Sequence, residues 1–194
     1  MNILARERKF STEGLFHATK QVLLEHGYEG FTFALLADLL DVSRGTLYKY
    51  YENKDELITD YMIYEMNQFL IDLKRIQEYP DFQSQFDYLI DIIFKDRSIP
   101  KIITMAQQIP AQSSDKVKAN KAHLDKHHLN MYKHLQSFIN LGREEKILKS
   151  NLADGLILGM IFQTIAIPNH FGVPQSEWVQ SIKDIVGHGM FTNS

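Results

Sequence analysis

Hydrophobic residues recur at steps of three and four along most of the chain, which is the spacing of amphipathic helices. Residues 15–26 follow it first, with Ser11 or Thr12 placed to cap the helix and Gly27 placed to end it. Shorter periodic segments follow, capped by Thr32, Ser43 and Asn53. They predict helices over 32–40 and 43–50, and a third that begins with a capping box completed by Glu56.

Longer helices are predicted after Asn53. The first runs from Lys54 to about Glu78 and is stopped by Pro80. Further helices are expected around residues 82–94, after Pro100, and over 115–141, 152–167 and 177–190. No segment shows the alternation of a convincing strand, so the prediction is an all-α chain of about nine helices.

Composition narrows the functional classes. The 194 residues are 44% hydrophobic and 23% charged, as in ordinary globular proteins. The chain has no cysteine, which excludes disulfides, thiolate zinc sites and cysteine nucleophiles. The first ten residues lack the apolar core of a signal peptide, and the apolar stretch 152–167 is short for a bilayer and contains Asp154 and Gln163. We expect a buried helix there and a cytoplasmic protein. The net charge of −3 means that nucleic-acid binding requires a local basic patch.

The most informative stretch is Thr32 to Leu57. Its two short helices are joined across Asp41-Val42-Ser43, which is the spacing of a helix-turn-helix motif. Such a turn needs a residue with positive φ, which Asp41 tolerates better than most residues other than glycine. Ala37 is small where the two helices would cross.

The second short helix carries the side chains of a DNA-reading surface. Arg44, Thr46, Lys49 and neighbouring tyrosine hydroxyls are donors for phosphates and base edges, and Gly45 lets the backbone approach another surface. Lys54 opposes the dipole of the next helix unless an anion binds nearby. From the residues alone, a merely solvated polar helix remains an open alternative.

Taken in order, these residues resemble the amino-terminal domain of TetR-family transcriptional regulators over about residues 10–60. The resemblance is carried by Val22–Tyr28, Thr32, Ala37, Val42–Tyr48 and Tyr50–Leu57. It implies an all-helical homodimer with a three-helix DNA-binding domain, here residues 1–53, and a ligand-binding and dimerisation domain, here 54–194. Most members of this family are repressors that leave their operator when a small molecule binds. Asp41 departs from the usual glycine and Tyr51 from a frequent phenylalanine.

The resemblance also assigns roles by motif position. It implies phosphate contacts for Thr32, Tyr48 and Lys54. The residues in or beside the major groove would be Arg44, Gly45, Thr46, Lys49 and Tyr50. Arg6, Arg8 and Lys9 precede the first helix and are candidates for the backbone or minor groove.

Bulky side chains in the remaining helices predict an apolar effector cavity, although each one also fits an ordinary core. The candidates are Phe86, Leu89, Met105, His128, Met131, Tyr132, Phe138 and Phe162. His128 is the polar position of an otherwise apolar stripe, where a core histidine and a ligand contact are both open. His123, His127 and His134 lie on an adjacent face, but no carboxylate completes a metal site, so we expect neither metal nor other cofactor.

The helix around residues 152–167 is apolar on all sides and must be covered on both. Its own domain covers one side, and a second subunit is predicted to cover the other, with a monomer that has a thick core as the alternative. The predicted interface contains Gly155, Gly159, Ile182, Ile185 and Val186.

No catalytic motif is recognisable in the sequence, so an enzyme is not expected. The leading hypothesis is a sequence-specific DNA-binding regulator, a repressor released from a palindromic operator by a small, largely apolar effector. The alternative is a helical protein-interaction module without DNA binding.

Overall fold

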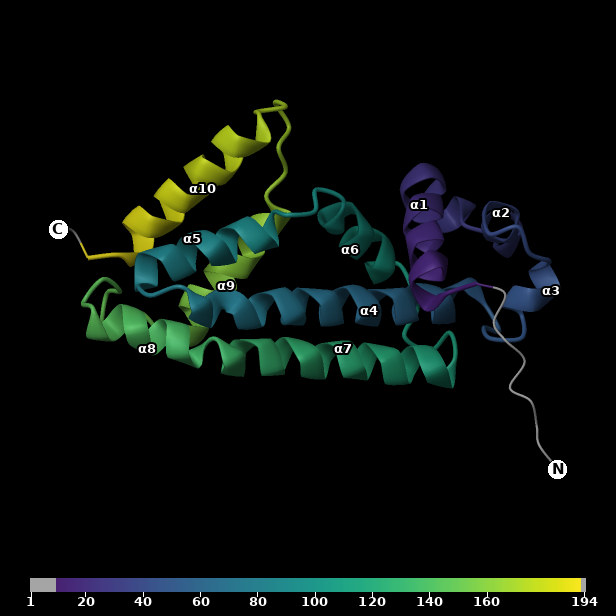
Figure 1. The fold of residues 1–194 in the computed structure, drawn as a ribbon, viewed down its shortest axis with the longest axis horizontal. Coiled ribbons are helices and arrows are strands. Elements are labelled where there is room, and N and C mark those ends of the chain that lie inside the picture. Colours follow the sequence, from purple (N-terminus) through teal and green to yellow (C-terminus); the bar gives the residue numbers. More distant parts are fainter. Residues whose placement is uncertain (1–9, 193–194) are drawn as a thin grey trace. The chain divides into compact units, whose positions relative to one another are not determined.

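A computed structural model describes residues 10–192, and within this range the chain folds into ten α-helices with two short 3-10 turns (Figure 1). The predicted all-α class is confirmed. Within residues 10–192, Leu148 and Phe191 form an isolated antiparallel β-bridge outside any strand. The elements are α1 (Thr12–Gly30), α2 (Phe33–Leu39), α3 (Arg44–Leu47), α4 (Lys54–Lys74), η1 (Arg75–Glu78), α5 (Phe82–Ile93), α6 (Ile99–Gln107), α7 (Asp115–His134), α8 (Gln136–Glu144), α9 (Asp154–Gln163), η2 (Thr164–Ala166) and α10 (Gln175–Met190).

Three helices depart from the sequence prediction. The helix expected over 115–141 is two helices, because the backbone of Leu135 (φ −89°, ψ 3°) interrupts the regular turns between α7 and α8. The second helix of the turn motif, α3, has four residues instead of about eight. Gly27, expected to end α1, adopts a left-handed conformation (φ 69°) inside it, and a further helical turn follows.

The chain divides into two compact units. The head unit combines the residues up to Glu65 with Lys101–Leu124, and the body unit combines Met66–Pro100 with the residues from Asp125 onward. Helices α4 and α7 each begin in the head unit and continue into the body unit. This division follows packing. The functional boundary placed between residues 53 and 54 concerns DNA and ligand binding, and it stays a prediction.

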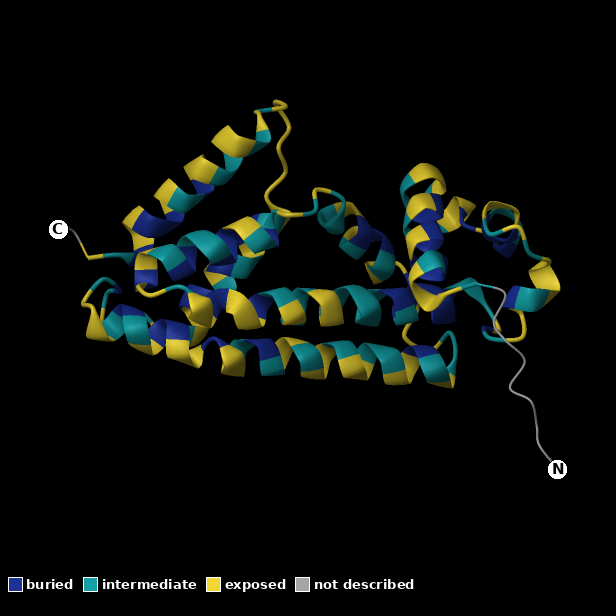
Figure 2. Cartoon of the chain, viewed as in Figure 1, coloured by how far each residue is buried: buried dark blue, intermediate teal, exposed yellow. Residues whose placement is uncertain are grey.

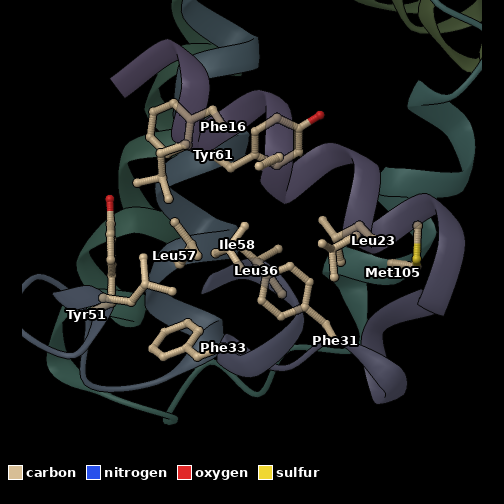
Figure 3. Close-up of a cluster of buried hydrophobic side chains, with 14 of the residues drawn as sticks. Phe16, Leu23, Phe31, Phe33, Leu36, Tyr51, Leu57, Ile58, Tyr61 and Met105 are labelled. Carbon is tan, nitrogen blue, oxygen red and sulfur yellow. The ribbon is translucent and has the colours of Figure 1, made fainter. Parts of the chain in front are cut away.

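The head unit has its own hydrophobic core (Figure 3). Helices α1 and α2 and the start of α4 supply most of it, and Leu23, Leu36, Leu57 and Ile58 are fully buried. Met105 of α6 lies close to Leu23 in Figure 3, so α6 completes the core from a segment distant in sequence. Burial of this kind contributes about 1.5–3 kcal/mol per large apolar side chain.

The body unit is built around aromatic rings. Phe82, at the start of α5, stacks on Phe138 of α8 at 4.7 Å between ring centroids and meets Phe191 edge-on at 5.5 Å. Helices α9 and α10 close this core with one face each, and Figure 2 shows exposed residues alternating with buried ones along α10. In the described residues no helix is long and apolar enough to cross a membrane.

Candidate nucleic-acid interface

The helix-turn-helix geometry follows from its caps. The Thr32 hydroxyl accepts a hydrogen bond from the Leu35 N–H at 3.3 Å and starts α2. At the other end, Asp41 is left-handed (φ 51°), as predicted. The Val42 N–H donates to the Ala37 carbonyl at 2.9 Å and the Asp41 N–H to the Asp38 carbonyl at 3.3 Å. This pair of bonds is a Schellman motif, which turns the chain sharply into α3.

Helix α3 is held by one side and open on the other. Leu47 is fully buried in the core of the head unit, while Arg44, Gly45 and Lys49 are exposed. A Cβ atom added at Gly45 would meet only the Ser43 hydroxyl, at 3.9 Å. Ser43 is the N-cap residue of α3, as predicted, but its hydroxyl pairs with that of Thr46 at 2.9 Å and accepts no backbone N–H. Arg44, Gly45 and Lys49 therefore form an uncrowded exposed surface.

Two tyrosines flank this surface and are oriented by neighbouring rings. Tyr48 is 59% exposed and packs edge-on against Phe33 at 4.9 Å. Tyr50 is partly buried and meets Phe10 edge-on at 5.8 Å. These contacts restrict the rings. Thr32 is exposed as well, so the eight predicted DNA-binding residues lie in α3, its flanks, the cap of α2 and the start of α4.

Lys54 has an intramolecular role that the sequence did not reveal. Its Nζ donates to the Tyr28 carbonyl at 2.7 Å and lies 4.1 Å from the centroid of the Tyr28 ring. The Tyr28 hydroxyl in turn donates to Asp55 Oδ1 at 2.8 Å. Burial and this carboxylate raise the pKa of Tyr28 to about 12. The first turn of α4 thus holds the end of α1 through both the backbone and the side chain of Tyr28.

Three acidic residues in the first part of α4 are buried or paired, whereas most other acids of the head unit are exposed, among them Glu29, Asp38 and Glu52. Asp55 and Glu56 are buried with hydrogen-bond donors. Asp60 pairs with Lys116 at 2.8 Å, and that lysine belongs to the 101–124 segment. This segment contributes four lysines and one acid to the unit. The predicted basic residues Arg6, Arg8 and Lys9 lie outside the described residues.

Six of the eight predicted effector residues lie in or against one core, that of the body unit, whereas Met105 and His128 do not. Met105 belongs to the core of the head unit, whereas Phe86, Leu89, Met131 and Phe138 are buried in the core of the body unit. Tyr132 and Phe162 stack on each other at 5.8 Å at its margin. His128 is exposed, and the partly buried histidine on α7 is His127, because the inward stripe passes from Leu124 to Met131 through residue 127.

The body unit has an open groove that sequence reasoning missed. It measures about 680 Å³ and lies between the end of α5 and the start of α10. Its lining mixes apolar and polar side chains: Asp91, Phe94, Arg97, Pro174, Gln175, Ser176 and Val179. Phe94 ends the helix predicted around residues 82–94, and the other lining residues are not among the predicted effector residues. Among the described residues no three metal-ligating side chains gather at one place, including around His123, His127 and His134.

The predicted dimer residues separate into two groups. Ile182 and Val186 are buried in the core of their own unit, and their place in a dimer interface stays a prediction. Ile185 is 73% exposed, and Cβ atoms at Gly155 and Gly159 would meet nothing within 4 Å. Leu156 and Met160 of α9, which lie beside these glycines, are more than half exposed. We call Gly155, Leu156, Gly159, Met160 and Ile185 the α9–α10 apolar face.

Part of the head unit is similar to a known protein family. Residues 15–61 match the model of the bacterial regulatory proteins, tetR family. This confirms the sequence resemblance, and the matched segment contains the helix-turn-helix and the start of α4. Among curated proteins there is no significant match.

Solved structures extend the likeness to the whole fold. FadR from Bacillus subtilis in complex with stearoyl-CoA is 18% identical, with a TM-score of 0.70 over 92% of this chain and 99% of that one. A TetR transcription regulator from Haloarcula marismortui is 19% identical, with a TM-score of 0.68 over 93% and 98%. AibR in complex with isovaleryl coenzyme A and operator DNA is 17% identical, with a TM-score of 0.65 over 94% and 97%.

These relationships define the class. Residues 15–61 match the TetR family model, and the described chain shares the overall fold of FadR and the Haloarcula marismortui regulator. The matched family consists of bacterial regulatory proteins, and FadR and the Haloarcula marismortui protein are transcription regulators.

Proposed function

We propose that the protein binds a specific palindromic operator as a homodimer through α3 and its flanks, and that it represses transcription until an effector releases it. The observation that carries this proposal is α3 itself. This helix is anchored by buried Leu47 and exposes Arg44, Gly45 and Lys49 without competing contacts among the described residues. A helix needed only for packing has no use for such a surface.

The α9–α10 apolar face supports the proposal of a dimer. Exposed apolar side chains on α9 and α10 are unfavourable in water unless a partner covers them. A second copy covers them by two-fold symmetry, and Gly155 and Gly159 leave room for close approach of the helices. Two heads on such a dimer would reach half-sites about one helical turn apart, roughly 34–40 Å between recognition helices.

The proposed effector is a small molecule with a large apolar part. FadR and AibR were solved with acyl-coenzyme A molecules, and the groove beside α10 combines Phe94 and Val179 with the guanidinium of Arg97. Arg97 has no ion-pair partner recorded among residues 10–192. Such a lining suits a ligand that carries an apolar chain and an anionic group.

The test is selection of fragments from the source genome by the purified full chain, followed by footprinting. Protection of a palindrome with two half-sites supports the proposal. Fragments retained without any common sequence would reject specific binding and favour the protein-interaction alternative. The effector is then sought by adding acyl-coenzyme A thioesters of increasing chain length to the selected complex. Release of the fragment by one chain-length class, together with derepression of a reporter, is the expected result.

A further inference from the structure

The 101–124 segment is an integral part of the head unit. Ile102, Met105 and Val117 are buried in the head core, and Lys101 Nζ donates to the Leu24 carbonyl at 2.8 Å. The loop between α6 and α7 lies against the start of α4, where it delivers two adjacent serines to two adjacent acids. The core itself is closed by apolar side chains, so the hydrogen bonds between these serines and acids are not needed to close it.

Each of these acids bridges the loop and the helix-turn-helix region. Asp55 accepts from the Ser113 hydroxyl through Oδ2 and from the Tyr28 hydroxyl through Oδ1. Glu56 accepts from the Ser114 hydroxyl through Oε1, at 2.8 Å, and from the Glu52 N–H through Oε2, at 3.0 Å. One oxygen of each carboxylate therefore contacts the loop. The other oxygen contacts Tyr28, near the end of α1, or Glu52, between α3 and α4.

Burial makes these contacts mutually dependent. Asp55 is 8% exposed and Glu56 is 4% exposed. A buried carboxylate that loses a donor is not compensated by water, so the remaining partners must shift to satisfy it. Displacement of either serine is thus transmitted to Tyr28 or to the segment that leaves α3.

Ser114 adds a connection to α7. Its hydroxyl oxygen also accepts from the Val117 N–H at 3.2 Å and thereby caps that helix. Asn120, one turn further along α7, donates to Asp60 at 2.7 Å and to Thr59 at 3.0 Å. Because α7 continues into the body unit, the serines stand where a helix shared by both units begins.

We propose that Ser113 and Ser114 are positioning residues for DNA binding, which hold Asp55 and Glu56 so that the helix-turn-helix is presented in the orientation that reads the operator. This inference rests on the proposed function. It makes the loop between α6 and α7 the place where a change in the body unit alters operator affinity, with no serine touching DNA.

The test compares operator with random DNA. Binding to random DNA uses phosphate charge and tolerates misorientation, whereas operator binding requires fixed side-chain positions. The double variant Ser113→Ala, Ser114→Ala is expected to lose about tenfold in operator affinity while its affinity for random DNA stays within twofold. Ser113→Thr, Ser114→Thr keeps both hydroxyls and should restore operator affinity to within about threefold of wild type. Ser181→Ala, which removes an exposed hydroxyl bonded to its own helix, is the matched control.

A purely structural role gives a different result. Lower stability alone reduces the folded fraction and lowers both affinities by the same factor, so an unchanged operator-to-random ratio overturns the inference. If the double variant does not fold, the single variants decide, and at least one must lower the ratio without lowering random binding. Failure of the wild-type chain to select any operator would instead reject the proposed function, which separates the two conclusions.

Discussion

The head unit and the body unit use buried space in different ways. The head unit places two carboxylates inside, each bridged by hydrogen bonds, and leaves cations on the surface of α3. The core of the body unit is filled with aromatic and aliphatic side chains, and it leaves the α9–α10 apolar face exposed. Directional contacts fix an orientation, whereas an apolar core tolerates many sequences of similar volume. The difference teaches that directional hydrogen bonds fix the orientation of helices in the head unit, whereas the core of the body unit mainly requires side chains that fill its volume.

The aromatic core of the body unit offers the largest effect. Phe82→Ala removes a fully buried ring that stacks on Phe138 and contacts Phe191. We expect the free energy of unfolding to fall by about 3–5 kcal/mol, as for other buried phenylalanines. Thermal denaturation measures the change. Phe171→Ala is the control, since Phe171 is 95% exposed, and it should change stability little. Equal melting temperatures for the two variants would contradict the assignment of Phe82 to the core.

Gly159→Leu tests the exposed face of the body unit. A leucine there meets no atom of its own chain within 4 Å of the new Cβ, so folding should be preserved. In a dimer built on this face the side chain would overpack the interface, at a cost of about 1–3 kcal/mol. Sedimentation should show a weaker dimer, and operator affinity should fall with it. Gly159→Ala serves as the smaller control. A dimer of undiminished strength would place Gly159 outside the interface.

Arg44→Ala and Lys54→Ala distinguish recognition of a base from contact with the DNA backbone by the head unit. Arg44 is exposed and is expected to read a base edge, so its loss should cost about 1–3 kcal/mol at the operator and relax one position. The Lys54 ammonium has N–H donors left beyond the one bonded to the Tyr28 carbonyl, and these are expected to contact a phosphate. Loss of Lys54 should therefore reduce the slope of log affinity against log salt concentration by about one unit on every DNA sequence. Titrations at several salt concentrations measure both. An unchanged slope for Lys54→Ala would limit that lysine to holding Tyr28.

Loss of the Tyr28 hydroxyl is expected to change stability least, and to change how stability depends on pH. Its pKa is raised to about 12 by burial and by Asp55, above the ordinary value of 10. The stabilising contribution is therefore complete below pH 10 and is lost as pH rises from about 10 to 12. Tyr28→Phe removes the bond to Asp55, at about 1 kcal/mol, and should remove this part of the alkaline loss of stability. Denaturant titrations of both proteins between pH 8 and about 12 make the comparison. Identical alkaline profiles would show that Tyr28 is not the titrating group.

The sequence predicted the head better than the body, for physical reasons. Caps and turns are local, so Thr32, Asn53 and the positive φ of Asp41 could be inferred from neighbouring residues. The contacts of Ser113 and Ser114 with Asp55 and Glu56 join residues 58 positions apart, and no periodic pattern marks them. The role of Lys54 was missed because its partner is a backbone carbonyl, which has no sequence signal.

In the body unit the periodic pattern located the helices, but it did not show which of their apolar side chains are buried and which are exposed. Ile182, Ile185 and Val186 fit one apolar stripe, yet only Ile185 is exposed. The spacing from Leu124 to Met131 is compatible with either His127 or His128 between them, so His128 was placed inward although it lies outside. The groove at Arg97 depends on the separation of α5 and α10, which residue spacing does not encode.

Gly45→Glu tests the central claim most directly, because stability and function are expected to move in opposite directions. The new side chain finds open space near α3, and glutamate favours a helix start, so the variant should melt at or above the wild-type temperature and still dimerise. If α3 enters the major groove, the added bulk and negative charge face phosphates and operator binding is lost, while uncharged Gly45→Gln loses less. Wild-type operator affinity in a folded, dimeric Gly45→Glu variant would contradict the account.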